Sequence, residues 1–129
     1  MRHSPPEFLD ITPAMRERLE KFRAEHANDP LGKVANHILY EDDDVRVWEM
    51  TLQPGEHTDL HKHEHDYILC IDSGDLVAGV PPKDFPMDIF VGKVPAAGNT
   101  VRVPKGGIEW AVNVGQKTYH EILIELKKA

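Results

Sequence analysis

The stretch of the chain richest in reactive side chains lies between residues 55 and 67, where four of its eight histidines occur. They are His57, His61, His63 and His65. Histidine is the commonest metal ligand near neutral pH, and an alternating spacing places side chains on one face of a β-strand. Neutral imidazoles that face inward need partners for their ring nitrogens. The spacing therefore favours a bound divalent metal over a cluster of surface histidines.

From about residue 34 onward, short β-type runs alternate with glycine- and proline-containing breaks, a pattern typical of an antiparallel sandwich or barrel. We expect strands near 36–41, 45–52, 59–61, 65–72, 75–80, 88–94, 100–103, 108–114 and 118–126. In the last of these, Ile122, Ile124 and Leu126 alternate with Glu121 and Glu125. The alternation predicts an apolar face toward the core and a polar face toward solvent.

The first thirty residues differ from the rest and predict one helix. Thr12 is suited to the N-cap, Pro13 to the first helical position, and the helix is expected to reach about Ala27. Met15, Leu19 and Phe22 recur at helical spacing, as expected of a stripe that docks on the main body or on a subunit partner. We therefore divide the chain into a helical arm, residues 1–33, and a barrel domain, residues 34–129.

Composition restricts the classes of partner. The formal net charge is −7, with 15 basic and 22 acidic residues, which argues against nucleic acid as a partner. The sequence lacks the run of roughly 18 apolar residues that spans a membrane, and its first residues lack the apolar stretch of a signal peptide. Cys70 is the only cysteine, so no intrachain disulfide forms and a reducing, cytoplasmic compartment is expected.

Two motifs resemble those of the cupins, small jelly-roll barrels that hold one metal inside. Gly55, His61, His63 and Gly74 fall on the spacing of the first cupin motif, with Tyr67 at the position of its glutamate. Gly98, Pro104, Gly106 and Asn113 fall on the spacing of the second, with Glu109 where its ligand histidine is expected. The resemblance covers about residues 34–126 and implies an all-β, antiparallel jelly-roll barrel, here preceded by a short helix.

The sequence does not determine which residues would bind the metal besides His61 and His63. Glu109 would complete a set of two histidines and one carboxylate, the pattern of open-sided iron(II) sites. However, the apolar alternation around Trp110 would turn Glu109 away from the barrel, unless a bulge at Gly106-Gly107 changes the register.

Three further residues are candidates for this site. His57 and His65 are alternative third or fourth ligands, or imidazoles outside the shell of ligands. Tyr67 is a candidate catalytic residue, as a hydrogen-bond donor or as an acid or base beside the metal.

The resemblance implies a metal-binding barrel that acts on a small polar molecule by lyase, isomerase or dioxygenase chemistry. The expected cofactor is a divalent transition metal, namely iron, manganese, nickel or zinc. Two alternatives are a non-catalytic barrel that binds or senses a ligand, and a metal-free acid–base site like that of sugar epimerases. We also expect a homodimer, formed with the help of residues 12–27 or of an edge strand.

Overall fold

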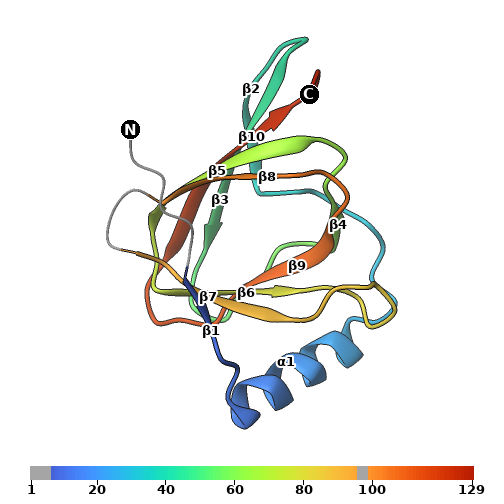
Figure 1. Ribbon diagram of the computed structural model, residues 1–129, viewed down its shortest axis with the longest axis vertical. Coiled ribbons are helices and arrows are strands. Elements are labelled where there is room, and N and C mark those ends of the chain that lie inside the picture. The colour runs from blue at the N-terminus through green and yellow to red at the C-terminus, as the bar shows by residue number, and fades with distance from the viewer. Residues whose placement is uncertain (1–6, 96–98) are drawn as a thin grey trace.

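The computed structural model describes residues 7–95 and 99–129, which form two antiparallel sheets and one helix (Figure 1). The elements are β1 (Glu7–Leu9), α1 (Pro13–Glu25), β2 (His37–Glu41), β3 (Val45–Leu52), β4 (His61–Lys62), β5 (Asp66–Ser73), β6 (Leu76–Val80), β7 (Phe90–Lys93), β8 (Thr100–Val103), β9 (Ile108–Asn113) and β10 (Tyr119–Leu126). All nine expected strands are present within a few residues of their expected bounds. Strand β1 was not expected, because three residues are too short to show a period.

The two sheets have five strands each. The first has the order β1-β7-β6-β9-β4 and is called the β9 sheet below; the second has the order β2-β3-β10-β5-β8 and is called the β10 sheet. In the described part of the chain, the strand ladders make two facing sheets rather than one continuous ring (Figure 1). This arrangement is the expected all-β jelly roll, with the short helix outside it.

Helix α1 begins and packs as its sequence predicts. The Thr12 hydroxyl accepts a hydrogen bond from the Met15 backbone amide at 3.2 Å, which caps the first turn. Leu19 is fully buried in a cluster with Trp110 and Val112 of β9, and Met15 and Phe22 pack against the same cluster. The apolar stripe of the helix therefore docks on the outer face of the β9 sheet, beneath the barrel in Figure 1.

A separate apolar core fills the space between the sheets. It includes Trp48, Met50 and Leu52 of β3, together with Tyr119 and Leu123 of β10. Strands β6 and β9 thus have one face in this interior and the other under the helix.

The expected orientation of β10 is wrong. Glu121 and Glu125 are buried, whereas Ile122, Ile124 and Leu126 are only half-buried and point outward. The two carboxylates have interior partners, because the Tyr119 hydroxyl donates to Glu121 and the Trp48 indole donates to Glu125. Hydrogen-bond partners of this kind reduce the cost of burying a carboxylate. The side of β10 that points inward was therefore not decided by apolar character alone.

The motif glycines lie in turns that need them. Gly55, Gly74 and Gly106 have φ of 86°, 129° and 111°, a region that side chains with a Cβ rarely adopt. Gly98 of the second motif lies outside the described residues. The Asn113 side chain donates to the carbonyls of Leu52 and Lys117, which ties the turn before β10 to β3.

No helix in the described ranges is long and apolar enough to cross a membrane.

Candidate metal centre

Two segments meet to form the centre. In the short ladder between β4 and β9, His61 lies opposite Glu109, so the two side chains share a face. His63 lies just beyond β4, where its amide donates to the Gly107 carbonyl and its carbonyl accepts from the Gly106 amide, both at 2.8 Å. The turn of the second motif therefore fixes the backbone of the second histidine.

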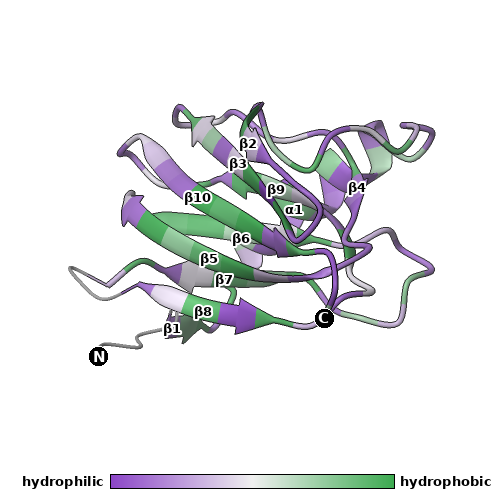
Figure 2. Cartoon of the chain, turned by 90° about the horizontal axis from the view of Figure 1, so that it is seen from above, coloured by the Kyte–Doolittle hydropathy of each residue, from purple (hydrophilic) through white to green (hydrophobic). Residues whose placement is uncertain are grey.

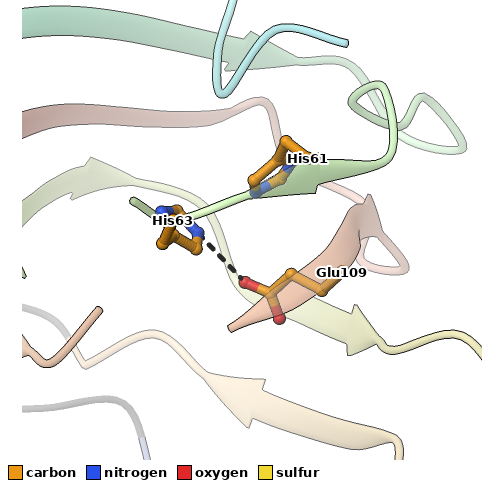
Figure 3. Close-up of side chains that lie close together, drawn as sticks. All are labelled: His61, His63 and Glu109. Atoms are coloured by element: carbon orange, nitrogen blue, oxygen red, sulfur yellow. Dashed lines mark ion pairs between the residues drawn. The ribbon is translucent and has the colours of Figure 1, made fainter. Parts of the chain in front are cut away.

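His61, His63 and Glu109 converge in the interior (Figure 3). Their candidate ligand atoms all lie within 4.8 Å of one another, and Nε2 of His63 is 3.7 Å from Oε1 of Glu109. The two imidazoles are 1% and 3% exposed, which confirms that both rings point into the barrel. The intervening Lys62 and the following Glu64 are exposed, as expected from their alternation with the histidines.

The surroundings of His61 define which of its nitrogens is free. Nδ1 lies 2.8 Å from the Asp59 carbonyl oxygen, which only accepts hydrogen bonds, so Nδ1 carries the proton and Nε2 has the lone pair. Burial, followed by the neighbouring His63, lowers the pKa of His61 below its ordinary value. The ring is therefore neutral near pH 7, in the form that binds a metal.

His63 is held differently. Tyr67 stacks on its ring, with centroids 4.0 Å apart and planes inclined by 18°. Nδ1 of His63 is buried and has no hydrogen-bond partner among the described residues. A buried ring nitrogen without a partner is costly, so such groups are rare in native structures.

Tyr67 is buried on the same inner face. Burial raises the pKa of its phenol far above the ordinary value, and the charges of Glu109 and Glu121 raise it further. In the protein alone the phenol keeps its proton. This favours the role of hydrogen-bond donor over that of phenolate base.

The orientation of Glu109, left open by the sequence, follows from the two-sided burial of β9. Trp110 points under helix α1 and is 1% exposed, so Glu109, on the opposite face, enters the interior. No bulge is needed to bring it there. Gly79 of β6 gives it space, because a Cβ at that position would lie 2.7 Å from Oε2 of Glu109.

The other two histidine candidates lie apart from this group. His57 is exposed and contacts helix α1, with its ring centroid 4.8 Å from those of Phe22 and His26. His65 is half-buried and lines a polar cavity of about 620 Å³ with Trp48 and Glu125. The structure thus brings together His61, His63 and Glu109 but not His57 or His65.

Glu121 is a polar residue of the interior that the sequence reasoning placed on the outside. Its Oε1 accepts a hydrogen bond of 2.7 Å from the Tyr119 hydroxyl, and its buried Oε2 has no partner among the described residues. Burial, and then the charge of Glu109, raises the pKa of Glu121 to about 7, although Tyr119 and His63 act in the opposite direction. The sequence did carry a signal for its inward position, because Glu121 lies at period-two spacing from Tyr119 and Leu123, which are buried on the same face of β10.

These residues fit a divalent transition metal. Two imidazoles and one carboxylate are a donor set that such ions bind, and their ligand atoms lie within 4.8 Å of one another, so that small side-chain movements would bring all three onto one ion at about 2.1 Å. Nε2 of His63 faces this group, and Gly79 leaves the space that the Glu109 carboxylate occupies in it.

Comparison with known proteins supports the fold but gives no activity. No family model matches the sequence. No curated protein matches it either. Among solved structures, a cupin domain from Bordetella pertussis Tohama I is similar with a TM-score of 0.59 and 21% identity, over 74% of this chain and 99% of that one.

Two other solved structures are also similar to this chain. A cupin superfamily protein from Desulfitobacterium hafniense DCB-2 has a TM-score of 0.53 and 20% identity, over 75% of this chain and 80% of that one. An RmlC-like cupin family protein from Methanocaldococcus jannaschii, with a double-stranded β-helix fold, has a TM-score of 0.55 and 18% identity, over 77% of this chain and 84% of that one. This chain therefore has the cupin fold.

Proposed function

We propose that the protein binds one divalent transition metal through His61, His63 and Glu109 and acts on a small polar molecule inside the barrel. The observation that carries the proposal is the convergence of three ligand-type side chains on one buried face. For His61, the bond to the Asp59 carbonyl leaves the ligand nitrogen free. Iron, manganese, nickel and zinc all accept such a donor set.

The bound ion would supply Lewis acidity, together with positions open to water or substrate. Tyr67 would orient the molecule by donating a hydrogen bond, because its phenol keeps its proton. Glu121 would accept or release a proton: without the ion its pKa is about 7, and the charge of the ion would lower that pKa and favour the form that accepts a proton. These roles suit a lyase, isomerase or dioxygenase reaction.

We place the entry of this molecule at the polar cavity that His65 lines. Trp48 and Glu125 belong to the inward face of the β10 sheet and also line this cavity. The cavity therefore lies next to the interior of the barrel. Arg46 and Lys62 also line this cavity. Their charges suit a polar rather than a purely apolar ligand.

A metal-free acid–base site is the second candidate function. The observation that favours it is the buried pair of Tyr119 and Glu121, which holds a proton with a pKa of about 7 without any ion. In this alternative, His63, Tyr67 and Glu109 would act as acid–base groups only. It predicts that the freshly purified protein contains no stoichiometric metal.

Metal analysis of the purified protein tests the proposal. We expect about one ion per chain in the wild type and loss of most of it in His61→Ala and in His63→Ala, because each change removes a ligand. His57→Ala and His65→Ala are matched controls from the same stretch and should keep the ion. Absence of metal from the wild type, or full retention in both ligand variants, would contradict the proposal and support the metal-free candidate.

A further inference from the structure

Only one of the two buried histidines has its ring fixed by a hydrogen bond. Nδ1 of His61 lies 2.8 Å from the Asp59 carbonyl oxygen and 3.3 Å from the Thr58 hydroxyl. Nδ1 of His63 has no such partner among the described residues. Ligand histidines almost always donate their second ring N–H to an acceptor, which fixes the orientation of the ring. The orientation of the His63 ring therefore has another cause.

The backbone around His63 is fixed, but it does not orient the ring. Hydrogen bonds of 2.8 Å join the amide and the carbonyl of His63 to Gly107 and Gly106. The torsion that turns an imidazole about its bond to Cβ has a broad energy profile, so this bond alone leaves many ring planes accessible. A Cβ added at Gly107 would lie 3.8 Å from Cδ2 of His63, an ordinary contact distance, so this turn does not clamp the ring either.

Two aromatic neighbours restrict the ring of His63 instead. Tyr67 lies flat against it, with centroids 4.0 Å apart and planes inclined by 18°. His61 meets the same imidazole nearly at a right angle, with centroids 4.8 Å apart and planes inclined by 87°. A rotation of the His63 ring would drive its edge into the phenol ring, so the stack fixes the plane of the imidazole.

Tyr67 is itself rigidly placed. Its strand, β5, is largely hydrophobic and lies between β10 and β8 (Figure 2). Tyr67 is paired in the two ladders with Glu125 and Val103, and its side chain is 5% exposed within the core between the sheets. Sites built on strands are more precise than sites on loops. The phenol ring is therefore a firm support for a histidine that lies just beyond the end of β4.

We propose that Tyr67 is a positioning residue, whose ring keeps the imidazole of His63 in the plane that directs Nε2 at the metal. This inference rests on the proposed function. In the stacked plane, Nε2 lies 3.7 Å from Oε1 of Glu109, so it already faces another ligand of the centre (Figure 3). The tyrosine at the position of the motif glutamate would thus serve the metal site without binding the ion.

Zinc affinity, measured by competition with a chromophoric chelator, tests the proposal. Tyr67→Phe keeps the aromatic ring and should bind zinc as tightly as the wild type does. Tyr67→Leu removes the ring and should bind about 10- to 100-fold more weakly, the usual loss when the group that orients a ligand is removed. Ile71→Ala is the matched control, because Ile71 is buried on the same face of β5 with the same 5% exposure. It should unfold more easily but keep its affinity for zinc.

Proton NMR of the metal-free wild type examines the stack itself and keeps the proposal testable if Tyr67→Leu fails to fold. A phenol ring over the face of His63 should shift the carbon-bound protons of the imidazole upfield, and His63→Gln identifies these signals by their loss. The shift should persist in Tyr67→Phe.

Four results would overturn the proposal while the wild type binds zinc. They are unchanged affinity in folded Tyr67→Leu, an equal loss of affinity in Tyr67→Phe, an equal loss in Ile71→Ala, and absence of the upfield shift from the wild type. The second would assign the effect to the hydroxyl, and the third to general loosening of β5. A wild type that binds no zinc would instead contradict the proposed function together with this inference.

Discussion

Replacement of Glu121 by glutamine should remove a pH dependence of stability that arises from one buried carboxyl. In the folded protein, burial raises the pKa of Glu121 from 4.5 to about 7, so the native state binds this proton more tightly than the unfolded chain does. The resulting stabilisation is complete below pH 4.5 and is lost as the pH rises through 7. At about 1.4 kcal/mol per factor of ten in proton affinity, the loss is about 3 kcal/mol.

The assay is urea unfolding of metal-free wild type and Glu121→Gln in the presence of a chelator, at several pH values from 4.5 to 8. We expect the free energy of unfolding of the variant, minus that of the wild type, to increase by about 3 kcal/mol across this range. Other groups titrate in both proteins, so their contributions cancel to first order. A difference that stays constant with pH would refute the reasoning.

A divalent metal should reduce the pH-dependent difference in unfolding free energy between wild type and Glu121→Gln, because a nearby positive charge favours the ionised carboxylate of Glu121. The same unfolding series with added metal measures this reduction, and a difference that the metal leaves unchanged would show that the ion binds elsewhere. Glu109→Gln should lose less metal than His61→Ala, and Tyr67→Phe the least, as metal analysis of the purified variants would show. Leu19→Ala should lower the free energy of unfolding by about 2–5 kcal/mol, because it leaves a cavity under the helix, while metal content stays unchanged. Loss of metal in this variant would show that the helix supports the site.

The fold was predictable because its signals are local. Alternation of Lys62 and Glu64 with the histidines fixed the inward face of that segment, since the opposite choice would bury charges. Thr12 and Pro13 marked the start of the helix, and turn glycines separated the strands. Each of these signals lies within a few residues of the feature that it predicts.

The positions of Glu109 and Glu121 depend on contacts that are distant in sequence. Glu109 enters the interior because helix α1, about 90 residues earlier in the chain, covers Trp110 on the opposite face. The apolar residues that alternate along β9, such as Trp110 and Val112, therefore pack against the helix and not in the core between the sheets. Glu121 is tolerated inside because Tyr119 donates a hydrogen bond to it, whereas Ile122, which the alternation placed in the core, is half-buried and points outward.

An anomalous difference map from crystals of the metal-loaded protein, measured at the absorption edge of the bound ion, tests the central claim most directly. We predict one strong peak per chain, about 2.0–2.2 Å from a ring nitrogen of both His61 and His63 and from a carboxylate oxygen of Glu109. A peak at His57 or His65 instead, or none beside His61 and His63 in protein that binds the metal stoichiometrically, would contradict the account.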